Sequence, residues 1–321
     1  MRSRAPDTSP EVVLFYRDFR RFTGGGLKVW DYFNHVLASP RHVPRISFSS
    51  GSLWDESNPW RGHERFIVAP EDRTSAEILF LGGKDWPSVP EAERDSSRRP
   101  IINLVQGVRH AWSRTPESAY LRHRAIRICV SEEVAAALRA TRRVEGPLFV
   151  IPNALDRTTL PTPRPAVERD LDLLIVADKQ PVFGRLMRAR LWRPGQRLRL
   201  LTSAIPRADF LDLLCRARVT LFLPNRAEGF YLPALEGMAL GTVVVCPDCV
   251  GNRSFCVPQH SCLRPAFDFR SIVAAVRAAQ QLPDLAVAEM LRNARATASR
   301  HDSSSERRAF LNILQNVDQL W

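Results

Sequence analysis

The stretch Arg226-Ala-Glu-Gly-Phe-Tyr-Leu-Pro-Ala-Leu-Glu-Gly-Met-Ala-Leu-Gly-Thr-Val-Val-Val-Cys246 joins two carboxylates, a loop, a helix start and a strand in one compact unit. Pro233 suits the first helical position, because its missing N–H has no helical partner there. Gly241 suits the position just after a helix end, so we expect a short helix over residues 233–240. The apolar run at residues 242–246 predicts a buried strand.

The loop before this helix consists of Gly229, Phe230, Tyr231 and Leu232. Its backbone N–H groups lie at a helix N-terminus, where unpaired donors and the helix dipole together favour a phosphate. A diphosphate is therefore the ligand that we expect at this loop.

The two carboxylates of the stretch lie on either side of the loop. Glu228 comes just before it, and Glu236 follows on the helix, so the two can bracket an elongated ligand. A carboxylate accepts paired hydrogen bonds from vicinal hydroxyls, such as those of a ribose or a hexose. Two isolated glutamates would more often be solvated surface residues, so the prediction depends on the whole stretch.

The stretch resembles the Glu-x7-Glu signature of retaining nucleotide-sugar glycosyltransferases with the GT-B fold, the group 1 or family 4 type. Other segments are similar to that family: residues 24–26 to its amino-terminal glycine loop, residues 130–132 to its strand-to-helix step, and residues 151–156 to its interdomain segment. The resemblance spans nearly the whole chain. It implies an α/β protein with two Rossmann-like, doubly wound domains that face each other across a cleft.

A chain of 321 residues is long enough to bury two cores of ordinary size. We expect an acceptor-binding domain over residues 1–157 and a linker, rich in Pro, Thr and Arg, over residues 158–170. The donor domain is expected over residues 171–321. In proteins with this fold the last helix often crosses back to the first domain, and we expect the same here.

The resemblance assigns roles on the donor side. Glu236 would hold the nucleotide ribose and Glu228 the transferred sugar. Lys179 matches the family lysine that contacts the donor diphosphate, whereas Asp178 stands where the family has an arginine.

Arg185 and Arg207 are the two candidates for the missing positive charge. The strand-end turn after Cys246 lies near the donor in the family, which makes Asn252 a further donor-side candidate.

On the acceptor side, Gly25 and Gly26 belong to the segment that resembles the family's glycine loop, and Lys28 follows it at the start of a predicted helix. Asp85 and Trp86 follow a buried strand predicted over residues 76–82, and ligands of open α/β sheets bind at the carboxyl ends of strands. They would meet the acceptor there, unless they only form a surface turn.

His110 follows the next predicted strand, over residues 100–107. Its imidazole could hydrogen-bond a sugar hydroxyl or carry a proton, although a purely structural histidine is the commoner case. We include His110 with Glu228 and Lys179 as the catalytic candidates.

The formal net charge of +12 points to an acidic partner: nucleic acid, anionic lipid or a phosphorylated substrate. Arginine far outnumbers lysine, which the codon usage of a GC-rich genome would explain equally well. The basic clusters are not interleaved with aromatic residues as in a single-strand-binding surface. We therefore expect a glycan, glycolipid or other hydroxyl acceptor and an anionic membrane surface as partners ahead of nucleic acid.

Four of the six cysteines form a Cys-x2-Cys-x6-Cys-x5-Cys string, and its first pair has the spacing of a zinc site. Because Cys246 ends a predicted buried strand, small buried hydrophobic residues are the alternative. The string comprises Cys246, Cys249, Cys256 and Cys262. Whether it binds metal is open at this point.

The sequence thus predicts a cytoplasmic enzyme, at most peripheral to the inner membrane, since it shows neither a signal peptide nor an eighteen-residue apolar run. The expected reaction is metal-independent, retaining transfer to a hydroxyl, in polysaccharide, lipopolysaccharide or other glycoconjugate synthesis. No cofactor is expected besides the donor. The alternatives are a transferase acting on DNA or another polyanion, a non-catalytic GT-B-like binding protein, and a metal-binding protein organised by the four cysteines.

Overall fold

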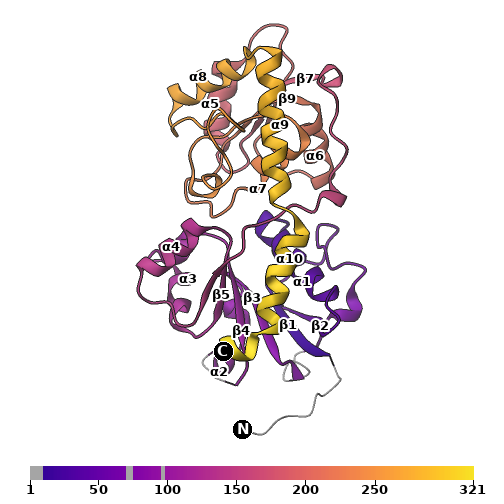
Figure 1. Cartoon of the computed structure of the whole chain (residues 1–321), viewed down its shortest axis with the longest axis vertical. Coiled ribbons are helices and arrows are strands. Elements are labelled where there is room, and N and C mark those ends of the chain that lie inside the picture. Colours follow the sequence, from indigo (N-terminus) through magenta and orange to yellow (C-terminus); the bar gives the residue numbers. More distant parts are fainter. Residues whose placement is uncertain (1–9, 70–74, 95–97) are drawn as a thin grey trace. The chain divides into compact units, whose positions relative to one another are not determined.

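The computed structural model describes residues 10–69, 75–94 and 98–321, and the contacts within the chain divide it into two compact units (Figure 1). The first unit comprises Met1–Ile151 with Arg307–Trp321, and the second comprises Pro152–Glu306. The expectation that no signal peptide is present depends partly on residues 1–9, which lie outside the described residues.

The first unit is built on a parallel sheet in the order β2-β1-β3-β4-β5-β6. Its strands are β1 (Glu11–Arg17), β2 (His42–Phe48), β3 (Ile78–Gly82), β4 (Ile101–Val105), β5 (Ile126–Cys129) and β6 (Leu148–Val150). The main helices are α1 (Gly24–Leu37), α2 (Glu91–Arg94), α3 (Pro116–Ala119) and α4 (Glu132–Ala140). Every residue of β3, β4 and β5 is buried, as expected for central parallel strands covered on both faces.

The second unit has a parallel sheet in the order β10-β9-β7-β8. Its strands are β7 (Leu171–Val176), β8 (Leu198–Leu201), β9 (Ala217–Phe222) and β10 (Val243–Val245). Its helices are α5 (Pro181–Leu191), α6 (Arg207–Arg216), α7 (Leu232–Leu240), α8 (Phe269–Gln280) and α9 (Asp284–Arg300). Leu173 and Ile175 of β7 lie in its core with Met187 of α5 and Ile272 of α8.

The two sheets share one winding pattern. In each, the second strand in sequence lies on one side of the first strand, and the third strand lies on its other side. The direction in which strands are added therefore reverses between β1 and β3 in the first unit and between β7 and β9 in the second. Ligands of doubly wound sheets bind at the carboxyl ends of the strands beside such a switch point.

The helix in the opening stretch has the predicted extent within one residue. It begins at Leu232, with Pro233 in its first turn, and Gly241 ends it in the left-handed conformation at φ +75°. A side chain is strained at that φ, which explains the glycine. The strand that follows is shorter than predicted and spans only Val243–Val245.

The boundary between the units differs from the predicted one. The predicted linker, residues 158–170, belongs to the second unit. The physical reason is Arg169, which is buried and donates to the carbonyl oxygens of Leu214, Ala217 and Leu240 at 3.1, 2.7 and 2.6 Å. The division falls after Ile151 instead.

The end of the chain groups with the first unit from Arg307 onward. This segment contains most of α10 (Ser303–Gln315) and all of α11 (Val317–Leu320). Phe310 is fully buried there against the rings of Tyr32 and Phe80, at centroid distances of 4.7 and 5.8 Å. In the described part of the chain, no helix is both long and apolar enough to cross a membrane.

Candidate active site

The switch point of the second unit gathers the donor-side candidates. Lys179 follows the end of β7, Glu228 follows the end of β9, and Arg207 follows the end of β8. Because the strands are parallel, these three side chains come from the same edge of the sheet. Glu236 is added by α7, which begins just beyond Glu228.

Lys179 and Glu228 form the central ion pair of this edge. The Lys179 Nζ lies 2.8 Å from Glu228 Oε1, and the same oxygen accepts from Asn225 Nδ2 at 3.2 Å. The Asn225 amide oxygen in turn accepts from Gln180 at 3.3 Å. A lysine and a glutamate that are far apart in sequence are thus held together at the switch point, with both side chains partly exposed to a ligand.

Arg207 and Glu236 form a second ion pair. The Arg207 Nη1 lies 2.6 Å from Glu236 Oε1, and Glu236 is only 3% exposed whereas Arg207 is 29% exposed. Of the two arginines proposed for the missing charge, Arg207 is therefore the one beside a predicted donor-binding carboxylate. Arg185 lies on the exposed face of α5 and has no carboxylate partner among the described residues.

The loop before α7 is held from behind by the turn after β10. Tyr231 N donates to Gly251 O at 2.8 Å, and Val250 N donates to Arg226 O at 3.1 Å. A Cβ on Gly251 would lie 2.8 Å from Phe230 N and 2.9 Å from Glu228 O, so only glycine permits this approach. The sequence indicated donor binding for this turn but did not single out Gly251.

These contacts correct one detail of the expected phosphate loop. The N–H of Tyr231 is already bonded to Gly251, so it is not available to a phosphate as it is placed here. The side chains of Phe230, Tyr231 and Leu232 are buried, which leaves the backbone as their means of contact with a donor. Gly229 is also buried.

Tyr231 supports the Lys179 end of the site. The Lys179 Nζ lies 5.4 Å from the centre of the Tyr231 ring, within the range of a cation–π contact. The phenol is fully buried and its hydroxyl has no hydrogen-bond partner among the described residues. Burial, with the carboxylates of Asp178 and Glu228 nearby, raises the pKa of Tyr231 well above its ordinary value.

Asn252 has a structural position in the turn rather than an open one. It is completely buried, and its side chain bonds Cys249 N at 3.2 Å, Pro247 O at 2.9 Å and Cys246 Sγ at 3.2 Å. Contact with a donor through the Asn252 amide would require these bonds to break. The residue instead holds the turn that carries Gly251.

The four cysteines of the string are all buried and free, and the Cys246 thiol is hydrogen-bonded to those of Cys249 and Cys256. Across the described ranges, no three His, Cys, Asp or Glu side chains are arranged to hold a metal ion. The thiols pack behind the loop at residues 229–232 as small apolar groups that also hydrogen-bond one another.

In the first unit, the glycine segment is helical. The sequence predicted a turn at residues 24–26 before a helix, but α1 already begins at Gly24, and Thr23 caps it by accepting from Gly26 N at 3.0 Å. The threonine cap was the signal that reasoning from the glycines missed. Gly25 lies beside the strand end of β4, where Gln106 donates to its carbonyl oxygen at 3.0 Å.

Three acceptor-side candidates are buried. Lys28 is 1% exposed and pairs with Asp31 at 2.8 Å on α1. Asp85 is equally buried and pairs with Arg17 at 3.0 Å across the switch point of the first unit, and burial raises its pKa while Arg17 opposes this. Trp86 is stacked on Tyr120, with centroids 5.5 Å apart. Their positions suit the support of strand ends better than direct contact with an acceptor.

His110 lies at the end of β4 in a short 3₁₀ turn, packed over Gly83, where a Cβ would lie 2.6 Å from its ring. Burial disfavours the imidazolium and lowers the pKa of His110 to about 4, although Glu117 acts in the opposite direction. The imidazole is therefore neutral near neutral pH, and it offers one ring nitrogen that donates a hydrogen bond and one that accepts.

This burial predicts a pH effect on stability. The pKa of His110 is about 4 in the folded chain and 6.5 without burial, so the unfolded chain binds more protons between these values. The free energy of unfolding should therefore fall as the pH drops through this window. In His110→Phe the fall should be smaller by up to about 3 kcal/mol. Urea unfolding followed by circular dichroism, at pH values near the two pKa values, measures the free energy of unfolding. An identical decrease in the wild type and in His110→Phe would contradict the prediction.

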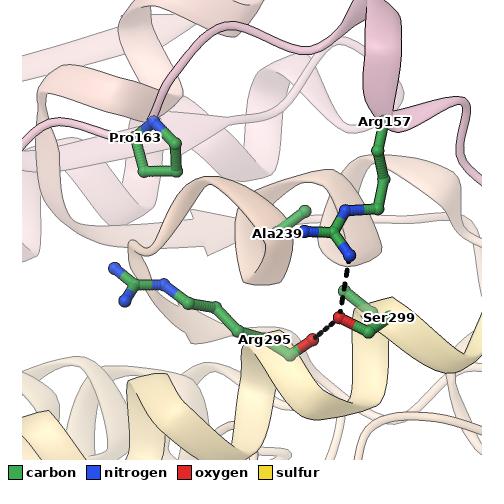
Figure 2. A pocket seen from close by; sticks show the side chains of 6 residues that line it. Arg157, Pro163, Ala239, Arg295 and Ser299 are labelled. Atoms are coloured by element: carbon green, nitrogen blue, oxygen red, sulfur yellow. Dashed lines mark hydrogen bonds between the residues drawn. The ribbon is translucent and has the colours of Figure 1, made fainter.

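A separate cavity of about 310 Å³ lies at the other end of α7 (Figure 2). It is lined by Arg157, Pro163, Ala239, Arg295, Ala298 and Ser299. Arg157 donates to the Ser299 hydroxyl at 3.3 Å, and Figure 2 shows the guanidinium of Arg295 on the opposite side. No residue that the sequence assigned to the donor or the acceptor lines this cavity.

Several solved structures resemble the fold over nearly the whole chain. HepE of Anabaena, in complex with UDP-glucose, has a TM-score of 0.75 at 12% identity, covering 95% of this chain and 99% of that chain. Sucrose-phosphate synthase from Thermosynechococcus elongatus has a TM-score of 0.73 at 13% identity, covering 96% and 99%. A glycosyltransferase from Rickettsia africae has a TM-score of 0.64 at 11% identity, covering 96% and 98%.

The chain has the GT-B fold. This confirms the fold class that the sequence predicted. No protein-family model matches the chain, and no curated protein matches it. At these identities the likeness shows the fold alone, and membership of family 4 stays a prediction.

Proposed function

We propose that this chain is a glycosyltransferase that moves a sugar from a nucleotide-diphosphate sugar to a hydroxyl acceptor. The observation that carries the proposal is the Lys179–Glu228 pair at the switch point of the second unit, with the Arg207–Glu236 pair beside it. The bound UDP-glucose in the structurally similar HepE supports a nucleotide-sugar donor and makes UDP the first nucleotide to test.

The two cations would stabilise the leaving group. When the diphosphate departs it develops negative charge, and preorganised positive groups lower the energy of that state. Lys179 and Arg207 come from the ends of different strands and are each neutralised by one glutamate. A bound donor would exchange these ion pairs for contacts of its own, with phosphates on the cations and sugar hydroxyls on the carboxylates.

We extend the proposal to a retaining, metal-independent reaction. The leaving phosphate would take the proton of the attacking hydroxyl, so that no separate general base is required. Positive side chains would take the place of a divalent cation at the diphosphate, and no cofactor beyond the donor would be needed. His110, with its neutral imidazole, would hydrogen-bond a sugar hydroxyl.

We assign the acceptor from the resemblance to retaining GT-B glycosyltransferases and not from the geometry of the site. A glycan, a glycolipid or another hydroxyl compound would accept the sugar, in polysaccharide, lipopolysaccharide or other glycoconjugate synthesis. The reaction would take place in the cytoplasm or at the inner face of the membrane.

Calorimetric binding of UDP, GDP, dTDP, CDP and ADP tests the donor site. We expect one nucleotide to bind the wild type and to bind Glu236→Ala about 100-fold more weakly, because paired charge-assisted hydrogen bonds to the ribose are lost. Glu289→Ala is the matched control, since Glu289 is an exposed carboxylate on α9 of the same unit. Its affinity should equal that of the wild type.

Two results would count against the proposal. The first is that none of the five nucleotides binds, which would favour a non-catalytic protein. The second is equal loss of nucleotide affinity in Glu236→Ala and Glu289→Ala. That result would show that the loss is not specific to the Glu236 side chain.

A further inference from the structure

One segment carries most of the surplus positive charge of the chain. Residues 179–208 contain eight Lys and Arg residues and no Asp or Glu, within a chain whose net charge is +12. Three of the eight have carboxylate partners: Lys179 with Glu228, Arg197 with Asp172 and Arg207 with Glu236. The other five, Arg185, Arg188, Arg190, Arg193 and Arg199, have none among the described residues.

Three of these five arginines, Arg185, Arg190 and Arg193, lie on or just beyond one face of α5 (Pro181–Leu191). The inner face of this helix packs Gly184, Met187 and Leu191 against the sheet. Successive residues of a helix are turned by about 100°, so Val182, Arg185, Leu186 and Arg190 lie on the opposite side. We call this side, with Trp192 and Arg193 just beyond the helix end, the α5 face.

The α5 face is apolar as well as cationic. Val182 is 67% exposed, Leu186 is 54% exposed and Trp192 is 56% exposed. Val182 and Leu186 are one turn apart, so they form a stripe with Arg185 and Arg190 on its two sides. A cationic helix face with a central apolar stripe and a tryptophan is the pattern of a surface that lies on a bilayer.

The elements that pack beside α5 continue the charge pattern. Helix α8 lies next to α5 (Figure 1) and carries Arg270 and Arg277 without a carboxylate between Phe269 and Gln280. Arg199 is exposed on β8, the edge strand of the sheet. The carboxylate that precedes α8, Asp268, is engaged in capping this helix through Ser271 N at 2.9 Å.

We infer that the α5 face binds an anionic membrane surface. The arginines would approach the lipid phosphates, and Val182, Leu186 and Trp192 would enter the interface between headgroups and acyl chains. A nucleic acid would satisfy the arginines but would leave the apolar stripe in water, which is why the lipid is favoured. The inference does not depend on the proposed enzymatic activity.

Sedimentation with vesicles of stated composition tests the inference. The wild type should bind phosphatidylcholine vesicles that contain about one-third phosphatidylglycerol, bind pure phosphatidylcholine far more weakly, and be released by high salt. Arg185→Gln/Arg190→Gln/Arg193→Gln should lower the partition coefficient by roughly one to two orders of magnitude. Leu186→Ser/Trp192→Ser should lower it by at least about tenfold.

The control is Arg114→Gln/Arg122→Gln/Arg143→Gln, which removes the same charge from exposed arginines of the first unit. Its partition coefficient onto anionic vesicles should be nearly that of the wild type. Equal loss in this control, or equal binding to neutral and anionic vesicles, would overturn the inference. So would tight binding of duplex DNA that survives the Leu186 and Trp192 substitutions when vesicles are not bound. Vesicle binding is measured without an activity assay. A protein that does not bind vesicles can therefore be told apart from one that does not bind nucleotides.

Discussion

Glu228→Gln should lower the rate of sugar transfer by about 10²- to 10⁴-fold, while nucleotide affinity stays within a few-fold of the wild type. A carboxylate accepts two charge-assisted hydrogen bonds from the hydroxyls of the transferred sugar, whereas an amide offers one acceptor and one donor. The glutamine is similar in size and its oxygen can still accept from Asn225 and Lys179, which now bond Glu228 at 3.2 and 2.8 Å. The folded structure should therefore persist.

The measurement combines initial rates with the cognate nucleotide sugar and calorimetry with the free nucleotide. Glu289→Gln, on the exposed side of α9, is the matched control and should leave both quantities unchanged. Parallel loss of transfer and nucleotide affinity in Glu228→Gln would show that Glu228 holds the nucleotide rather than the sugar. Unchanged transfer would remove Glu228 from the site.

Gly251→Ala should have the second large effect, through the backbone of the donor loop. The new Cβ would lie 2.8 Å from Phe230 N and 2.9 Å from both Glu228 O and Phe230 Cα. All three atoms belong to the main chain, so no side-chain rotation relieves the clash and the loop has to move. A displacement of about 1 Å at a reacting group can cost about 100-fold in rate, and we expect transfer to fall by at least that amount.

The control for Gly251→Ala has to lose stability without moving the loop. Gly195→Ala does this, because Gly195 has φ +77° but a Cβ added there would have no other atom within 4 Å. Both variants should lose about 1–2 kcal/mol of unfolding free energy. Only Gly251→Ala should lower the rate of sugar transfer. Equal transfer rates in the two variants would contradict the role assigned to the turn after β10.

Several local features of this chain could be predicted from the sequence because they depend on backbone chemistry over a few residues. Pro233 in a first helical turn and Gly241 at positive φ delimit α7 within one residue. The apolar runs of β3 and β4 predicted buried strands, which the structure confirms. The resemblance of the Arg226–Cys246 stretch to GT-B glycosyltransferases predicted the fold class that the structure confirms.

The direction of each side chain at a strand end could not be predicted in this way. Asp85 and Lys28 have the residue types of a ligand site, yet Asp85 turns inward to Arg17 and Lys28 is buried beside Asp31. Asn252 likewise turns inward, to the backbone of its own turn. Whether a polar side chain meets a ligand or stabilises a loop depends on which strands become neighbours.

The order of the elements, their approximate ends and the residue types near the expected donor follow from the sequence alone, because hydrophobic periodicity and helix termini act locally. The pairing of Lys179 with Glu228, the choice of Arg207 over Arg185 beside Glu236, and the approach of Gly251 to Phe230 depend on the folded chain. These contacts join residues from the ends of different strands. They exist because β7 lies between β8 and β9, and that arrangement results from packing of the whole sheet.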